Sequence, residues 1–291
     1  MKILTASGWD DYALLDSGDG KRLERFSKYV LVRPDPEAIW KKKQSEIWSK
    51  ADAVFADEKN NPHWEHGARV PKEWPVTYKN LTFQARLSPF KHTGIFPEQS
   101  VNWEFMEQKI AERVRGSIET SPNVLNLFGY TGAASLVCAI AGARVTHVDA
   151  SKPAIGWARE NQRLSGLLEK PIRWIMDDAV KFVAREVRRG VKYDAIIMDP
   201  PIYGHGPNGE VWDFHRSFPE LVSLCRLVLS EKPLFFLVNA YAISSSAIML
   251  NNVLSDYLSE RGGTCECGEI ALEEKEGKRL LSTGIFARWS W

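Results

Sequence analysis

Acidic and small residues gather in four short segments of the 291-residue chain, and each segment follows an apolar run that predicts a β-strand. The segments are 128–133, 149–151, 177–179 and 199–203. In a parallel sheet the carboxyl ends of the strands share one edge, and ligands bind there beside the point at which the strand order reverses. The spacing therefore predicts one ligand site assembled from all four segments.

The first segment turns from strand to helix around Gly129 and Gly132. A dinucleotide-binding turn needs three glycines, G-x-G-x-x-G, so that the backbone can approach a pyrophosphate. Thr131 stands at the middle glycine position, which disfavours a nicotinamide dehydrogenase. Asp149, 20 residues after Gly129, still fits a carboxylate that accepts the hydroxyls of a ribose. Ribose recognition without a pyrophosphate turn suits a single adenosine, so we expect S-adenosylmethionine as the cofactor.

The third segment adds groups suited to an adenine ring. Asp178 is expected to accept the exocyclic amine, and the backbone N–H of Ala179 is expected to donate to the ring. The cofactor residues expected from the first three segments are Gly129, Thr131, Gly132, Asp149, Ala150, Ser151, Asp178 and Ala179. A structural interpretation stays open, in which the glycines form only a tight turn and the two acids cap the helices that follow them.

The fourth segment carries the most specific motif, Asp199-Pro200-Pro201. Two prolines remove two N–H donors, so the carbonyls at the strand end are expected to point outward as free acceptors beside the carboxylate. Such a row can hold an N–H of a planar base, and Tyr203 can stack on the face of that base. These four residues are the expected catalytic residues. In the alternative interpretation the prolines only end the strand and Tyr203 packs against the protein.

Alternating strand and helix patterns must position these groups. From residue 100 onwards, strands are predicted over 123–128, 144–149, 172–175, 193–199 and 234–239, with a closing hairpin over 264–270 and 284–288. Helices are predicted over 101–118, 133–141, 153–164, 178–189, 214–229 and 246–260. This alternation predicts the α/β class for residues 91–291, as a doubly wound, mostly parallel seven-stranded sheet. Residues 1–90 instead predict a small, mainly β domain with one helix over 37–50.

Composition excludes several classes of protein. The chain is 44% hydrophobic and carries 38 Lys and Arg against 37 Asp and Glu, which excludes intrinsic disorder and a polybasic nucleic-acid coat. The longest apolar stretch, 233–243, is interrupted by Asn239 and is far shorter than the ~20 residues of a membrane span. The N-terminus lacks the apolar run of a secretory signal. We therefore expect a cytoplasmic protein without a membrane partner, in which any nucleic-acid surface is a local patch.

Several other residues have two possible interpretations. The pair Cys265 and Cys267 has no second pair to complete a zinc set, so no metal is expected. The Gly-rich loop 203–212 is a possible lid over the acceptor site. Within it His205 contacts substrate or is solvated, and the lysines at 41–43 touch phosphate or form a solvated helix face. The tryptophans at 9, 40, 48, 64 and 74 suit a small core or, less well, an aromatic platform.

The run 88–288 resembles the class I S-adenosylmethionine-dependent methyltransferases, and within them the methyltransferases of large-subunit ribosomal RNA that modify cytosine carbon 5 or guanine nitrogen 7. Three motifs carry the resemblance: the lead-in T-G-x-x-x-x-Q at 93–99, the first motif at 124–132 and the Met-Asp-Pro-Pro motif at 198–201. In that family the lead-in loop closes over the methionine end of the cofactor. The resemblance therefore implies roles for Thr93 and Gln99, and it also implies that Phe128 and Tyr130 in the first motif bind the cofactor.

The chain departs from the carbon-5 enzymes of that group at one place. They carry a Ser-Cys nucleophile after strand five, where this chain reads Val238-Asn239-Ala240. Attack on carbon 6 of a cytosine needs a thiolate, and Cys225 lies in an apolar helix where a core thiol is expected. We therefore expect methyl transfer to a base nitrogen of RNA, with ribosomal RNA as substrate. The alternatives are a methyltransferase for a small molecule or a protein, and a non-catalytic protein that binds RNA or the cofactor.

Overall fold

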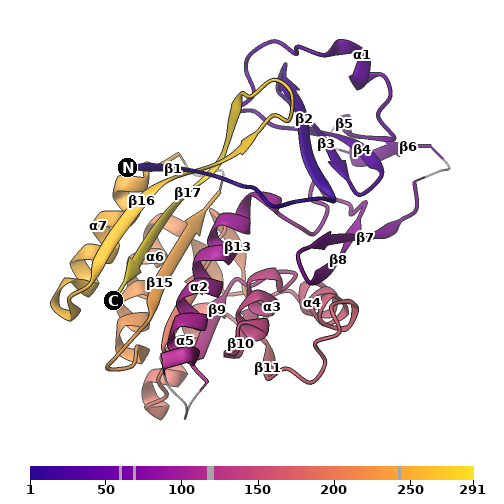
Figure 1. Cartoon of the computed structure of the whole chain (residues 1–291). Helices are drawn as coiled ribbons and strands as arrows, with labels where there is room; N and C mark the ends of the chain where they lie inside the picture. Colours follow the sequence, from indigo (N-terminus) through magenta and orange to yellow (C-terminus); the bar gives the residue numbers. More distant parts are fainter. Residues whose placement is uncertain (59–60, 68–69, 117–120, 242–243) are drawn as a thin grey trace. The chain divides into compact units, whose positions relative to one another are not determined.

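A computed structural model describes residues 1–58, 61–67, 70–116, 121–241 and 244–291 (Figure 1). The described chain divides into two compact units. The sheet unit comprises residues 1–4, 102–270 and 283–291, and the N-terminal unit comprises residues 5–101 and 271–282. The N-terminal unit is thus discontinuous in sequence. The division into functional domains at 1–90 and 91–291 remains a prediction.

A twisted sheet forms the centre of the sheet unit, and within the described residues it has eight strands in the order β1-β16-β17-β15-β12-β9-β10-β11. These strands are β1 (Lys2–Thr5), β9 (Asn123–Leu127), β10 (Arg144–Asp149), β11 (Ile172–Met176), β12 (Ala195–Met198), β15 (Phe235–Ala240), β16 (Thr264–Glu273) and β17 (Leu280–Ser290). The five neighbouring strands β15, β12, β9, β10 and β11 are parallel to one another, whereas β17 is antiparallel to β15. The doubly wound α/β class is confirmed.

The predicted number of seven strands was wrong, because β1 adds an eighth beside β16. The segment Lys2–Thr5 is too short for an alternation of apolar and polar residues to predict a strand there. The close approach of β1 to β16 requires the glycine at 268, because a Cβ built there would lie 1.8 Å from the carbonyl oxygen of Lys2. The strand order reverses between β9 and β12, which is where such a sheet binds ligands.

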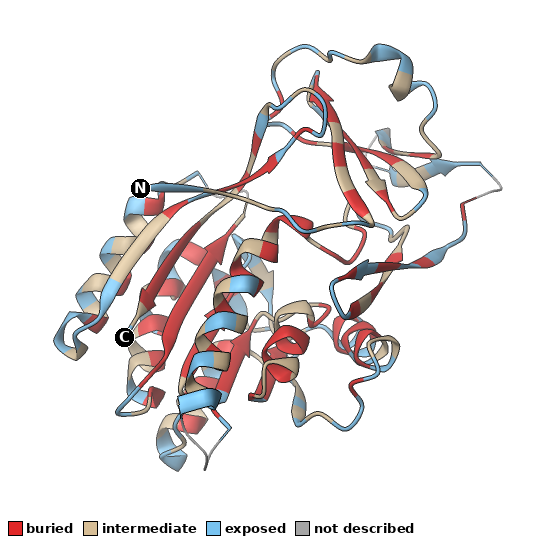
Figure 2. Cartoon of the chain, viewed as in Figure 1, coloured by how far each residue is buried: buried red, intermediate tan, exposed pale blue. Residues whose placement is uncertain are grey.

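Helices cover both faces of this sheet (Figure 1). They are α2 (Ser100–Gly116), α3 (Ala133–Ile140), α4 (Lys152–Leu164), α5 (Ala179–Arg189), α6 (Phe214–Val228) and α7 (Ala247–Leu258). Figure 2 shows the central strands buried and the outer helix faces exposed, as expected for parallel strands covered on both sides. None of the helices in the described residues combines the length and apolar character needed to cross a bilayer. The predicted helix end Ile118 and the apolar-stretch end Ile243 lie outside the described residues.

The N-terminal unit is mainly β, as predicted. Its strands are β2 (Tyr12–Gly18), β3 (Lys21–Phe26), β4 (Tyr29–Pro34), β5 (Ala53–Glu58), β6 (Asn61–His66), β7 (Glu73–Tyr78) and β8 (Leu81–Arg86), and two short helices are α1 (Ser45–Trp48) and η1 (Pro97–Gln99). Trp74 is buried against Tyr29, and the indole N–H of Trp48 donates to Asp16. These contacts favour the core-packing interpretation of the early tryptophans.

The predicted helix over 37–50 was wrong, because only α1 is helical there. The backbone N–H groups of Asp19 and Gly20 donate to the carbonyls of Trp40 and Ala38, which holds this segment in an extended loop against the β2–β3 turn. The buried carboxylate of Asp16 accepts from the backbone of residues 43 and 44. Tertiary hydrogen bonds thus outweigh the helical propensity of the lysine run.

A buried ion network occupies the centre of the N-terminal unit. Arg33 forms two hydrogen bonds with Glu24, of 2.6 and 2.7 Å, and the Tyr12 hydroxyl donates to the same carboxylate at 2.8 Å. Arg22 pairs with Glu24 at 3.2 Å and with Asp35 at 3.5 Å. Burial raises the pKa of Glu24, but the two guanidinium groups outweigh burial and lower it to about 2. Glu24 is therefore ionised and holds β2, β3 and β4 together.

Replacing Glu24 by Gln leaves two buried guanidinium groups without their shared carboxylate. We expect the free energy of unfolding to fall by about 3–5 kcal/mol, because removing one partner of a buried ion pair leaves an uncompensated buried charge. Urea denaturation followed by tryptophan fluorescence measures this, with exposed Glu37→Gln as the control. Equal unfolding free energies for Glu24→Gln and the control would contradict the role of the network.

The same network predicts a pH dependence. Because the folded pKa of Glu24 is below the ordinary value of 4.5, its stabilising contribution is complete above that value. It is lost as the pH falls from 4.5 towards about 2. The wild-type protein should therefore lose stability more steeply over this range than Glu24→Gln does, which denaturation at successive pH values measures.

Candidate active site

The turn between β9 and α3 contains two bulky residues in the left-handed region. The φ angles of Phe128, Tyr130 and Gly132 are 55°, 49° and 83°. A bulky residue rarely adopts positive φ, and each instance costs about 1–3 kcal/mol and persists only where the surroundings enforce it. Here the Gly129 N–H donates to the Val148 carbonyl at 3.1 Å. Strain of this kind clusters at functional sites, which supports a binding role for the turn.

A buried polar row lies beneath the turn and leaves no space for a side chain at Gly129. Asn126 donates to the Ser135 hydroxyl at 2.9 Å, and that hydroxyl lies 3.0 Å from Nδ1 of His147. A Cβ on Gly129 would lie 2.3 Å from Cε1 of His147. Burial lowers the pKa of His147 to about 3, so the ring is neutral. The glycine is thus required by packing against a fixed imidazole.

Asp149 connects the turn to the end of β10. Its Oδ2 accepts from the Tyr130 N–H and its Oδ1 accepts from the Ser151 N–H, both at 2.8 Å. Burial raises the pKa of the carboxyl, and these two backbone donors oppose that rise. The N-cap of α4 is Ser151, so the alternative that Asp149 caps this helix was wrong. Each carboxylate oxygen accepts more than one hydrogen bond, so both can also receive hydroxyls.

Asp178 is the N-cap of α5, as the structural interpretation allowed. Its Oδ1 accepts from the Lys181 N–H at 2.9 Å, and Ala179, which follows it, is buried. The neighbouring Asp177 forms an ion pair with Arg185. The cap uses one carboxylate oxygen of Asp178, so its role towards adenine remains a prediction.

The Asp199-Pro200-Pro201 motif follows β12 at the next strand end. Asp199 is accessible to solvent but is surrounded by protein, and this burial raises the pKa of its carboxyl. A hydrogen bond of 2.8 Å from Nδ2 of Asn239 to Oδ1 of Asp199 opposes the rise. The expected row of free acceptors was partly wrong, because the indole N–H of Trp212 donates to the Pro201 carbonyl at 2.7 Å. The carbonyls of Asp199 and Pro200 remain as candidate acceptors.

The Gly-rich loop 203–212 is a hairpin with strands β13 (Tyr203–His205) and β14 (Val211–Asp213). Trp212 is buried against Phe128, with ring centroids 4.8 Å apart. An ion pair of 2.6 Å between Lys181 and Glu210 ties the hairpin tip to α5. Tyr203 is 56% exposed, so it does not pack into the core, and it meets exposed His205 edge to face. The hairpin therefore joins the Gly129 turn to the Asp199 motif.

Two residues of this site were missed by sequence reasoning. Trp212 stands in a segment rich in glycine, where its indole had no evident partner. Asn239 is the one polar residue of the run Phe235–Ala240, and the side chains of that strand are all buried. A lone amide inside an apolar strand was the available signal for Asn239.

Thr93 and Gln99 belong to the N-terminal unit, where Thr93 is buried and Gln99 is half-buried at the end of η1. The backbone carbonyl of Thr93 accepts from the Arg86 N–H at 3.0 Å. Their role at the methionine end of the cofactor remains a prediction.

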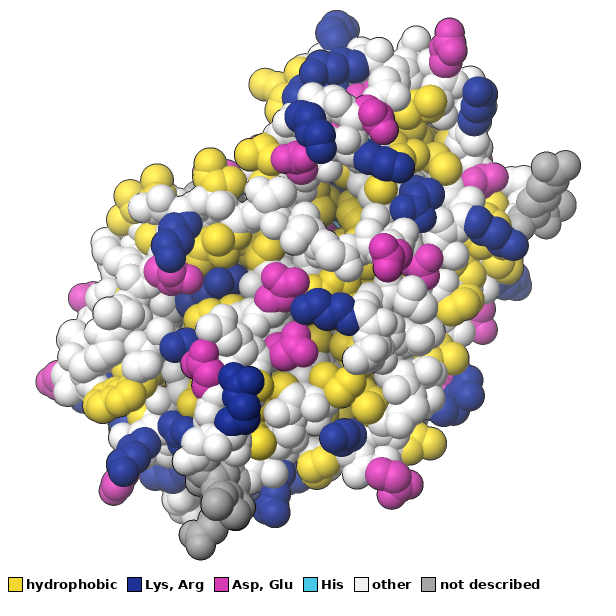
Figure 3. Space-filling model, in the orientation of Figure 1, with side chains coloured by type: hydrophobic (Ala, Val, Ile, Leu, Met, Phe, Trp, Pro, Cys, Tyr) yellow, Lys and Arg dark blue, Asp and Glu magenta, His cyan; other side chains and the backbone are white. Residues whose placement is uncertain are grey.

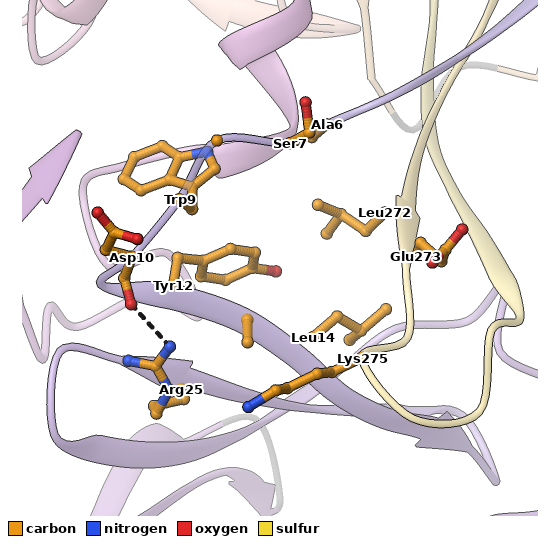
Figure 4. A pocket seen from close by; sticks show the side chains of 12 residues that line it. Ala6, Ser7, Trp9, Asp10, Tyr12, Leu14, Arg25, Leu272, Glu273 and Lys275 are labelled. Atoms are coloured by element: carbon orange, nitrogen blue, oxygen red, sulfur yellow. Dashed lines mark hydrogen bonds between the residues drawn. The ribbon is translucent and has the colours of Figure 1, made fainter. Parts of the chain in front are cut away.

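The N-terminal unit also contains a hollow of about 370 Å³ (Figure 4). Its wall combines Tyr12, Leu14 and Leu272 with charged side chains of both signs, which are Arg25, Lys275, Asp10 and Glu273. Arg25 donates to the carbonyl of Asp10, as the dashed line in Figure 4 marks. The two basic and two acidic side chains balance in number, so the wall does not carry charge of a single sign.

Metal-ligating and thiol groups do not gather in this region. Within the described part of the chain, no group of three or more His, Cys, Asp or Glu side chains is arranged to hold a metal ion. Cys225 is fully buried in α6, and burial raises its pKa. Cys265 and Cys267 are half-buried on β16.

Comparison with known proteins agrees with this geometry. Residues 57–256 match the family described as S-adenosylmethionine-dependent methyltransferase. The crystal structure of an S-adenosylmethionine-dependent methyltransferase from Agrobacterium tumefaciens is 42% identical, with a TM-score of 0.94 over 100% of this chain and 93% of that chain. A methyltransferase structure from Streptococcus mutans, 18% identical with a TM-score of 0.73, covers 97% of this chain and 76% of that chain and shows the fold alone.

Curated relatives include the ribosomal RNA large subunit methyltransferase K/L of Shewanella frigidimarina. It is 30% identical over 181 residues, which is 59% of this chain and 24% of the relative. The namesake from Shewanella baltica strain OS195 is 25% identical over 253 residues, which is 79% of this chain and 34% of the relative. The chain thus spans about a quarter to a third of the length of these relatives.

Replacing Gly129 by Ala should distort the turn, because its Cβ would overlap the imidazole of His147. We expect a loss of about 1–3 kcal/mol of stability and at least tenfold weaker S-adenosylmethionine binding. Thermal unfolding and isothermal titration calorimetry measure the two effects. Gly156→Ala in α4 is the matched control, because no described atom lies within 4 Å of its Cβ position. Wild-type affinity in Gly129→Ala would show that the turn does not bind the cofactor.

Proposed function

The chain belongs to the S-adenosylmethionine-dependent methyltransferase family, and we propose that its acceptor is a base nitrogen of RNA, with ribosomal RNA as the substrate. The observation that carries this proposal is the Asp199 carboxyl beside Asn239, at the strand end next to the Gly129 turn. A carboxylate with an adjacent free carbonyl is suited to hold the N–H of a planar base.

The residues at the turn fit the cofactor by their donor chemistry. We propose that Asp149 accepts the ribose hydroxyls, and that Asp178 and the Ala179 N–H contact adenine. The strained backbone of Phe128 and Tyr130 keeps the carboxylate of Asp149 in place through the hydrogen bond from the Tyr130 N–H. The other residues proposed to line this site are Gly129, Thr131, Gly132, Ala150 and Ser151, with Thr93 and Gln99 at the methionine end.

When bound, S-adenosylmethionine supplies an electrophilic methyl group on a sulfonium. In the proposed mechanism the Asp199 carboxylate and the Pro200 carbonyl accept N–H groups of the acceptor base and aim the lone pair of the attacked nitrogen. Tyr203 stacks on the base, and Pro201 fixes the backbone between them. The raised pKa of Asp199 also suits its carboxylate to take a proton from the methylated nitrogen. Positioning and desolvation therefore supply most of the catalysis.

The choice of nitrogen over carbon 5 rests on the cysteines. Covalent activation of a cytosine needs a thiolate at the site. At the end of β15, where such a thiolate would be expected, this chain carries Asn239 instead. Cys225 is buried, and burial raises its pKa. Both observations favour direct attack by a nitrogen lone pair.

The choice of RNA rests on the names of the curated relatives and on the exposed ring of Tyr203. We propose that residues 1–90 recognise the substrate, and that Arg25 at the hollow of Figure 4 contributes a cationic contact. A second candidate is a small-molecule or protein acceptor. Figure 3 favours it in one respect, because Lys and Arg alternate with Asp and Glu over the face shown, without a basic stripe.

Asp199→Asn tests the assigned role. We expect unchanged S-adenosylmethionine affinity and a loss of transfer of about 10²–10⁴-fold, because the amide cannot act as proton acceptor. The assay uses labelled S-adenosylmethionine and RNA from a strain lacking the protein, followed by nucleoside mass spectrometry. Asp256→Asn, on the exposed side of α7, is the matched control. Methylation of metabolites or proteins but never of RNA would reject the RNA proposal, and full transfer by Asp199→Asn would reject the role of the carboxylate.

A further inference from the structure

Asn239 is a buried amide with an unusual set of partners. It lies in β15, where every residue is buried, and it is only 2% exposed. Its Nδ2 donates to Oδ1 of Asp199 at 2.8 Å. Its own Oδ1 is buried and has no hydrogen-bond partner among the described residues.

The fold alone does not explain this side chain. A buried amide oxygen without a partner destabilises the folded state, because it loses its hydrogen bonds to water and gains none. A leucine of similar size would fill the same space without that cost. The favourable contact that the structure gives this side chain is therefore the hydrogen bond to Asp199.

The strand register explains why the two residues meet. Strands β12 and β15 are parallel neighbours, with Met198 opposite Val238. The residues that come next are Asp199, directly after β12, and Asn239 on β15, and both lie at the carboxyl edge, where sheets of this kind bind ligands. An amide N–H donor at this position can hold Oδ1 of the Asp199 carboxyl and leave Oδ2 available as an acceptor.

We propose that Asn239 is a positioning residue that fixes Oδ1 of Asp199, so that Oδ2 is the oxygen that receives the N–H of the methyl acceptor. This inference rests on the proposed function, because it gives Asp199 an acceptor to hold. It also assigns a role to the position on β15 where the carbon-5 enzymes carry their nucleophile, because Asn239 contributes an orienting amide there.

Asn239→Leu tests the proposal, with exposed Asn252→Leu on α7 as the matched control. We expect a Tm that is unchanged or higher, unchanged S-adenosylmethionine affinity, unchanged KM for RNA and a kcat lower by about 10–100-fold. A residue kept for stability would give the opposite pattern, because its loss would lower Tm and leave kcat intact. That opposite pattern would overturn the inference.

A second readout does not depend on the acceptor. Carbon-detected NMR follows the titration of the Asp199 carboxyl, with its signal assigned by comparison with Asp199→Asn. Burial and the Asn239 hydrogen bond are the two influences on this pKa, so the pKa should rise further in Asn239→Leu. An unmoved pKa would overturn the inference even if RNA is the substrate. A raised pKa without any RNA methylation by the wild type would support the positioning role and reject only the proposed substrate.

Discussion

The close approach of the Gly129 backbone to the buried ring of His147 is the constraint on which the site depends. It forces the chain to leave β9 without a side chain at this point, and the bulky residues on either side of Gly129 adopt positive φ angles. Because Tyr130 is held this way, its N–H reaches the carboxylate at the end of β10. Because Phe128 is held this way, its ring reaches Trp212 on the hairpin. One packing contact thus places groups on both sides of the strand-order reversal.

The two key carboxylates of the site are prepared differently. Both oxygens of Asp149 accept backbone N–H groups, so its position is set by the same turn that it helps to hold. Asp199 receives one side-chain hydrogen bond, from Asn239, and is open to solvent. A carboxylate with both oxygens held by hydrogen bonds suits the recognition of a group that takes no part in the reaction, such as ribose. A carboxylate fixed on one oxygen retains an acceptor for the group that reacts.

Sequence reasoning found the parts of the fold that local pattern dictates. The five parallel strands, their helices and the groups at their carboxyl ends follow from apolar runs and glycine turns, which report on nearby residues. The helix over 37–50 failed because Asp16 and the β2–β3 turn hold that segment from a distance. The same limit hid the bond from Trp212 to the Pro201 carbonyl, 11 residues away, and the bond from Asn239 to Asp199, 40 residues away. The eighth strand needed a pairing between the two ends of the chain, which no local period reveals.

The balanced charge of the chain bears on how the proposed substrate is selected. A net charge of +1 provides little general attraction to a phosphate backbone, so few counterions would be released on binding. Discrimination must then come from contacts with the base itself. The exposed ring of Tyr203 and the carboxyl of Asp199 stand on either side of Pro200 and Pro201, which restrict the backbone between them. Because Asp199 sits among protein atoms that raise its pKa, a hydrogen bond formed there is stronger than one formed in open water. The proposed site can therefore select a base by its stacking face and its N–H groups without a basic surface around it.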